Sequence, residues 1–107
     1  MKTLLFGLIA TVIIAMTFSS VSLAADTGAD VFKAKCATCH GPDGSGSTPV
    51  GKSLKLRDLS SKEVQAQSDA DLTTIITKGK NKMPAYDGKL TKEQIDSLVK
   101  FVRSLKK

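Results

Sequence analysis

The sequence predicts an all-α protein, and three observations predict it. Apolar residues recur at helical spacing in two segments, residues 72–76 and 95–105. A Ser or Thr stands before each segment, three residues ahead of an acidic or amide side chain, which is the pattern of a capping box. No segment alternates apolar and polar residues over the length of a strand. We therefore expect three to five helices joined by loops.

Residues 1–24 have the pattern of a cleavable secretory signal peptide. Lys2 gives a positive start, residues 4–18 form an apolar run, and small residues precede a predicted cut after Ala24. The run is shorter than the roughly 20 residues of a membrane-spanning helix. We therefore expect cleavage, and retention as an N-terminal membrane anchor is the alternative. Residues 25–107 then form one small domain.

The first predicted helix covers residues 30–36, after Gly28, with Val31 and Phe32 as its apolar face. Residues 41–51 follow it and are rich in glycine and proline, which break both helices and strands. We predict that they form a loop over one side of a bound group.

Capping-box pairs mark the starts of three further helices, namely Ser60 with Glu63, Ser68 with Asp71, and Thr91 with Gln94. The first of these helices is short and is predicted to end at Gln67. The second ends at Gly79, which suits a left-handed residue after a helix. The last helix carries an apolar stripe that Phe101 widens.

The most informative motif is Cys36-Ala37-Thr38-Cys39-His40, which matches the C-x-x-C-H attachment site of c-type haem. Two thiols at this spacing can form thioethers with the two vinyl groups on one edge of a haem. His40 then lies under the iron as the proximal ligand.

Three other interpretations of this motif are weaker. A structural disulfide would close a very short loop and constrain little of the unfolded chain. A thioredoxin-like redox pair would follow an apolar strand, and none precedes Cys36. A zinc site needs four ligands, whereas the chain has two Cys and one His. We therefore predict one haem c, bound covalently through Cys36 and Cys39.

Met83 is the second chemically informative residue. It lies in a predicted loop, it is the only methionine after the predicted cut, and Pro84 restricts its backbone to extended conformations. The alternative is an apolar side chain that fills a gap in the core. Because His40 is the only histidine, we predict His40 and Met83 as the two axial ligands of the iron.

A chain this short usually needs a metal or a covalent link for stability. Large apolar side chains are few in residues 25–107, and a haem would give them a broad apolar surface to pack against. We therefore expect the haem-free polypeptide to be largely unfolded or molten.

With these motifs the chain resembles a small class I cytochrome c, the monohaem bacterial type. The resemblance rests on residues 36–40, the Gly28-x-x-x-Phe32-x-x-x-Cys36 spacing, the Met83-Pro84 loop and the last helix with Phe101. It implies the small cytochrome c fold, in which the helices wrap around one covalently attached haem. It also implies that Gly28 allows the first and last helices to cross closely, and a linker glycine is the alternative.

The resemblance further implies two polar contacts of the haem site. A loop proline carbonyl accepts a hydrogen bond from the proximal histidine Nδ1, and Pro49 is the candidate. A side chain also contacts a haem propionate, for which Arg57 and Tyr86 are the candidates, with a plain surface role as the alternative for both.

Two protein ligands on the iron leave no position for a substrate, so the predicted function is one-electron transfer between redox partners in the periplasm. We expect an electron carrier and not an enzyme. A labile Met83 would instead favour a haem-based ligand sensor or a peroxidase. A retained N-terminal segment would favour a subunit through which electrons enter a membrane complex.

The chain is basic, with a formal net charge of +6. Lysines flank both motifs, namely Lys33 and Lys35 before the cysteines and Lys78, Lys80 and Lys82 around Met83. They predict redox partners with acidic docking patches, which include membrane complexes. The alternative is a set of solvated lysines that only keep the protein soluble. No basic and aromatic surface motif indicates nucleic-acid binding, and we expect a monomer.

Overall fold

The computed structural model describes residues 27–107, so the predicted signal peptide lies outside the described residues. Its regular elements are α1 (Gly28–Lys35), α2 (Ala37–His40), α3 (Pro49–Ser53), α4 (Lys62–Gln65), α5 (Asp69–Lys78) and α6 (Lys92–Ser104). Within residues 27–107, β-structure is limited to two isolated bridges. The all-α prediction is confirmed, with more helices than expected because α2 and α3 are short additional ones. No helix in this range has the length and hydropathy needed to cross a membrane.

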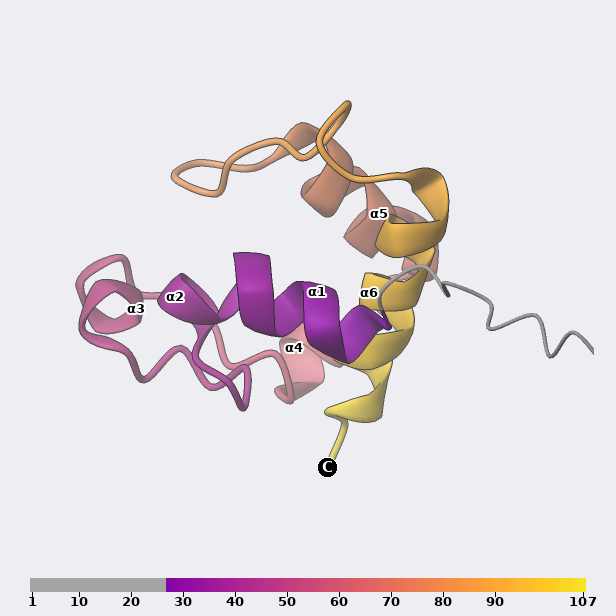
Figure 1. Ribbon diagram of the computed structural model, residues 1–107. Coiled ribbons are helices and arrows are strands. Elements are labelled where there is room, and N and C mark those ends of the chain that lie inside the picture. Colours follow the sequence, from indigo (N-terminus) through magenta and orange to yellow (C-terminus); the bar gives the residue numbers. More distant parts are fainter. Residues whose placement is uncertain (1–26) are drawn as a thin grey trace, which may run out of the picture.

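Helices α1 and α6 cross closely and form the frame of the fold (Figure 1). A Cβ added to Gly28 would lie 2.0 Å from the carbonyl oxygen of Ser97, so only glycine fits at the crossing. The rings of Phe32 and Phe101 pack against each other, with centroids 4.7 Å apart. The close approach predicted at Gly28 is confirmed. Helix α1 starts earlier than predicted because the Thr27 hydroxyl accepts a hydrogen bond from the Asp30 N–H and caps it.

Two of the three capping boxes are present as predicted. Ser68 with Asp71 begins α5, and Thr91 with Gln94 begins α6. Gly79 ends α5 at φ 74° and ψ 172°, so its φ is positive as expected although its ψ lies outside the left-handed helical region. The inner faces of these helices join a single core, whose buried members are Val31, Phe32, Val64, Leu72, Ile76, Ile95, Leu98, Val99 and Val102.

The prediction of a capping box at Ser60 is wrong by one residue. The Ser61 hydroxyl accepts from the Val64 N–H and caps α4, which ends at Gln65 and not at Gln67. Ser60 is used differently, because its N–H and hydroxyl both donate to the Asp58 carboxylate. Asp58 thus holds Ser60 in a turn that precedes the helix.

The predicted loop over residues 41–51 is also partly wrong. Pro49 is the first residue of α3, where the missing N–H costs nothing, and the Thr48 hydroxyl accepts from the Gly51 N–H. The chain then leaves α3 through Lys55, which has φ 56°. A Schellman motif forms there, because the Lys55 N–H donates to the Lys52 carbonyl and the Leu56 N–H to the Gly51 carbonyl.

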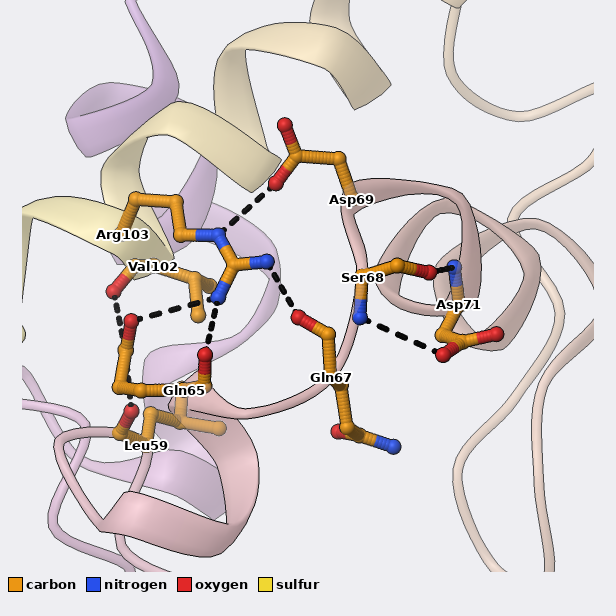
Figure 2. Close-up of polar contacts among 8 residues, drawn as sticks. All are labelled: Leu59, Gln65, Gln67, Ser68, Asp69, Asp71, Val102 and Arg103. Atoms are coloured by element: carbon orange, nitrogen blue, oxygen red, sulfur yellow. Dashed lines mark hydrogen bonds and ion pairs between the residues drawn. The ribbon is translucent and has the colours of Figure 1, made fainter.

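A polar cluster fastens the α4 region to α6 (Figure 2). The Arg103 guanidinium donates to the carbonyls of Gln65 and Gln67 and to the Asp69 carboxylate. The Gln65 amide in turn donates to the carbonyls of Leu59 and Val102, at 2.8 and 2.9 Å. These contacts fix one wall of the cavity described next.

Candidate haem site

A cavity of about 310 Å³ opens between the α1–α2 region, α5 and α6. Its lining includes Phe32, Cys36, His40 and Met83, with core residues of α5 and α6 behind them. A smaller cavity of about 60 Å³ adjoins it and is lined by both cysteines, His40 and Met83. The structure therefore brings all four residues predicted for the haem site to one place.

The C-x-x-C-H motif is held by continuous helical turns. The Cys36 N–H donates to the Phe32 carbonyl and the His40 N–H to the Cys36 carbonyl, both at 2.9 Å. Gly41, at φ 80°, then ends α2. The Thr48 hydroxyl donates to the Cys39 carbonyl at 2.7 Å, so the start of α3 supports the motif from behind.

His40 lies in the wall of both cavities. Its Nδ1 is buried and has no hydrogen-bond partner among residues 27–107. Burial lowers the pKa of His40, which favours the neutral imidazole that a metal requires. The predicted hydrogen bond from Nδ1 to the Pro49 carbonyl is absent, because Pro49 is the first residue of α3 and its carbonyl points along that helix.

Cys36 and Cys39 are free thiols that form no disulfide with each other. Burial, followed by the nearby Cys39, raises the pKa of Cys36 to about 11. Cys36 is therefore a protonated thiol over the physiological range.

Met83 is presented on a tight turn of the chain. The N–H of Lys80 donates to the Met83 carbonyl and the N–H of Met83 to the Lys80 carbonyl, at 3.2 and 2.9 Å. Asn81 adopts φ 53° within the turn, a conformation that asparagine tolerates. A Cβ on Gly79 would lie 2.5 Å from the Met83 carbonyl oxygen, so the turn packs directly on the end of α5. These hydrogen bonds and the close packing against Gly79 therefore fix the backbone around Met83.

The two residues suggested for a propionate contact lie at the cavity as well. Arg57 lines the larger cavity, and Tyr86 lines both. The Tyr86 hydroxyl already donates to the Lys35 carbonyl at 3.2 Å. Arg57 is therefore the better placed of the two for an external carboxylate.

Residues 54–59 form a wall of the larger cavity that was not predicted from the sequence. Leu54, Lys55, Leu56, Arg57 and Leu59 line the larger cavity, whereas residues 41–51 line neither cavity. The predicted loop over the bound group is therefore wrong, and the segment after α3 takes that place. Thr48 before Pro49 was a sequence signal for the start of α3, because a Ser or Thr followed by Pro is typical of a helix N-terminus.

The residues present fit a haem c. Two free thiols, an imidazole whose pKa is lowered by burial and a thioether line a largely apolar cavity that also has cationic lining residues. This is the donor set of a His/Met haem with two thioether links. The fold and this cavity together define a c-type cytochrome.

Comparisons with known proteins agree with that class. The family model described as "Cytochrome C oxidase, cbb3-type, subunit III" matches residues 23–102. Cytochrome c6 of Nostoc sp. is 40% identical over 87 residues, which cover 79% of this chain and 76% of that protein. Cytochrome c6 of Synechococcus sp. is 38% identical over 106 residues, which cover 95% and 91%.

Two solved structures are similar to this one. The KustC0563 c-type cytochrome has a TM-score of 0.70 and 36% identity, covering 76% of this chain and 99% of that one. Cytochrome c6C from Synechococcus sp. PCC 7002 has a TM-score of 0.54 and 29% identity, covering 72% and 90%. The chain belongs to the small monohaem c-type cytochromes, which are electron carriers.

Proposed function

We propose that this cytochrome carries one electron at a time between redox partners, with Cys36 and Cys39 bound to the haem and His40 and Met83 on its iron. The single observation that carries the proposal is that these four side chains converge on adjoining cavities, with Met83 held in a turn that two backbone hydrogen bonds close. A gap-filling methionine would need no such support.

The haem supplies a one-electron iron couple, and a His/Met pair raises its potential. The chain's own residues keep water from it. Phe32, Leu72, Ile76 and Leu98 present apolar side chains to the cavity, and Met83 lines it as well. With both axial positions held by the protein, no substrate reaches the iron, so the proposal is for a carrier and not a catalyst.

We propose the periplasm as the site of action, because residues 1–24 have the pattern of an export signal. The partners proposed are redox proteins with acidic docking patches. All charged residues that line the two cavities are cationic, namely Lys35, Lys55, Arg57, Lys80 and Lys82. Electron-transfer rates to an acidic partner should fall as ionic strength rises. Rates that do not change with salt would remove the charge-steering part of the proposal.

The ligand assignment is tested by optical spectra of the holoprotein with and without CO. The wild type should show low-spin haem with the weak near-infrared band of Met bound to ferric iron, unchanged by CO in the reduced state. Met83→Ala should lose that band and bind CO. Leu56→Val, which alters another cavity-lining side chain, is the control and should keep the wild-type spectra. A wild type with high-spin iron or a CO-shifted Soret band would instead indicate a sensor or a peroxidase.

A second candidate, a subunit through which electrons enter a membrane oxidase, is favoured by the description of the matching family model. The two functions differ in the N-terminus of the mature protein. A mature chain that starts at Ala25 and appears in the periplasmic fraction supports the carrier. A retained N-terminal segment and recovery with membranes support the oxidase subunit.

A further inference from the structure

Tyr86 links the two sides of the haem cavity. Its backbone is fastened to α5, because its N–H donates to the Ile76 carbonyl at 3.1 Å. Its side chain extends to the opposite side, where the hydroxyl donates to the Lys35 carbonyl at the end of α1. Tyr86 therefore connects the part of the chain that carries Met83 to Lys35, the residue before Cys36.

This contact has no equivalent elsewhere at the cavity mouth. We define the Met83 segment as residues 79–90. Within the part of the chain that the structure describes, the bond from Tyr86 to Lys35 is the only hydrogen bond between the Met83 segment and residues 28–41. Helices α1 and α5 are otherwise connected through α6, which packs on both. Without this bond, the hydrogen bonds that join the Met83 segment to the rest of the described chain would all go to α5.

The Tyr86 ring is placed to transmit this contact to Met83. Tyr86 and Met83 both line the two cavities and both pack, half-buried, against the core. Only two residues, Pro84 and Ala85, separate them, and two backbone hydrogen bonds between Lys80 and Met83 close the turn around Met83. Movement of Tyr86 away from Lys35 would therefore carry Met83 with it.

We propose that the Tyr86 hydroxyl acts as a clasp that holds Met83 in place at the iron and so limits its exchange for external ligands. Tyr86 is a positioning residue in this account, since it acts through Met83. The inference rests on the proposed function, in which Met83 is an axial ligand.

The test is binding of imidazole to the ferric holoprotein, followed by its optical shift, in the wild type and in Tyr86→Phe. Phenylalanine keeps the ring that lines the cavities and removes only the donor. A hydrogen bond contributes modestly in net terms, so the imidazole affinity of Tyr86→Phe should rise roughly two- to tenfold. The near-infrared band of bound methionine should also disappear at a lower temperature than in the wild type.

The matched control is Thr74→Ala, which removes a hydroxyl that bonds to the Ala70 carbonyl within α5. It should leave the imidazole affinity unchanged, even if both variants unfold at slightly lower temperature. A purely structural role of Tyr86 would lower the unfolding temperature without any change in imidazole affinity, and that result overturns the clasp.

Met83→Ala separates failure of the clasp from failure of the ligand assignment. If Met83→Ala binds imidazole more tightly than the wild type while Tyr86→Phe does not, only the clasp is overturned. If Met83→Ala binds imidazole with wild-type affinity, no methionine ligand was displaced, and the proposed ligation fails together with the clasp.

Discussion

Two segments that line the haem cavity are attached to the rest of the domain in very different ways. Five hydrogen bonds join the α4 segment, residues 59–69, to Val102 and Arg103 of α6 (Figure 2). Arg103 donates four of them, and the Gln65 amide donates the fifth to the Val102 carbonyl. The Met83 segment, residues 79–90, has one hydrogen bond to a part of the chain beyond neighbouring α5, from Tyr86 to Lys35. The α4 segment is thus joined to α6 by several hydrogen bonds, whereas the Met83 segment is joined to α1 by one.

The difference separates overall stability from ligand exchange. A charged guanidinium that bonds to backbone carbonyls contributes more than a neutral hydroxyl does, and its loss leaves several acceptors unsatisfied. A single neutral hydrogen bond at an exposed site can open without unfolding the core. Variants of the α4 segment should therefore change the free energy of unfolding, whereas variants of the Met83 segment should change the imidazole affinity.

Gly28→Ala should have the largest effect, because both segments depend on the crossing of α1 and α6. The new Cβ would lie 2.0 Å from the Ser97 carbonyl oxygen, so the helices must separate. We expect a loss of about 3 kcal/mol in the free energy of unfolding, which is measured by denaturant titration of the holoprotein. Ala29→Ser, at an exposed neighbouring position, is the control and should change little. Near-wild-type stability of Gly28→Ala would mean that the crossing is wrongly placed.

Arg103→Met should weaken the attachment of the α4 segment to α6 and leave the Met83 segment unchanged. It keeps the apolar stem of the side chain and removes the donors to Gln65, Gln67 and Asp69. We expect the free energy of unfolding to fall by about 2 kcal/mol, mostly from the unpaired carbonyls, since the Asp69 carboxylate is largely exposed. Imidazole affinity should stay as in the wild type.

The control for this variant is Lys100→Met, which removes an exposed cation from the same helix. It should change neither the free energy of unfolding nor the imidazole affinity. If the imidazole affinity rose as much for Arg103→Met as for Tyr86→Phe, the two segments would not differ as described. Both would then limit the exchange of Met83 for imidazole.

Much of this frame could be predicted from the sequence, because its signals are local. The capping boxes at Ser68 and Thr91 and the apolar stripe of α6 need only residues three or four apart. The motif at Cys36, Cys39 and His40 is local too, and Met83 follows from composition, since it is the only candidate thioether in the domain. These residues meet at the cavity as expected.

The contacts that distinguish the two walls could not be predicted in this way. Arg103 and Gln65 are 38 residues apart, and Tyr86 and Lys35 are 51 apart. Their acceptors are backbone carbonyls, which every residue has, so no residue type marks them. The misplaced start of α4 has a different, local cause. Ser60 and Ser61 are adjacent, and the Asp58 carboxylate accepts from Ser60, which leaves Ser61 to cap the helix.

Lys55→Gly should have the smallest effect and the opposite sign. Lys55 lies between α3 and the α4 segment at φ 56°, in the Schellman position that usually holds glycine. A left-handed conformation costs a side-chain-bearing residue about 1–2 kcal/mol, and glycine loses roughly 0.5–1 kcal/mol more conformational entropy on folding. The balance is a gain of about 0.5 kcal/mol in the free energy of unfolding.

Lys52→Gly is the matched control, because Lys52 is an exposed lysine inside α3. Both changes remove one positive charge, but glycine in a helix is unfavourable by about 1 kcal/mol, so Lys52→Gly should lower stability where Lys55→Gly raises it. Equal changes in the two variants would show that charge, and not backbone conformation, sets the result. With the expected opposite signs, the left-handed backbone of Lys55 carries a free-energy cost in the cationic lining of the cavity.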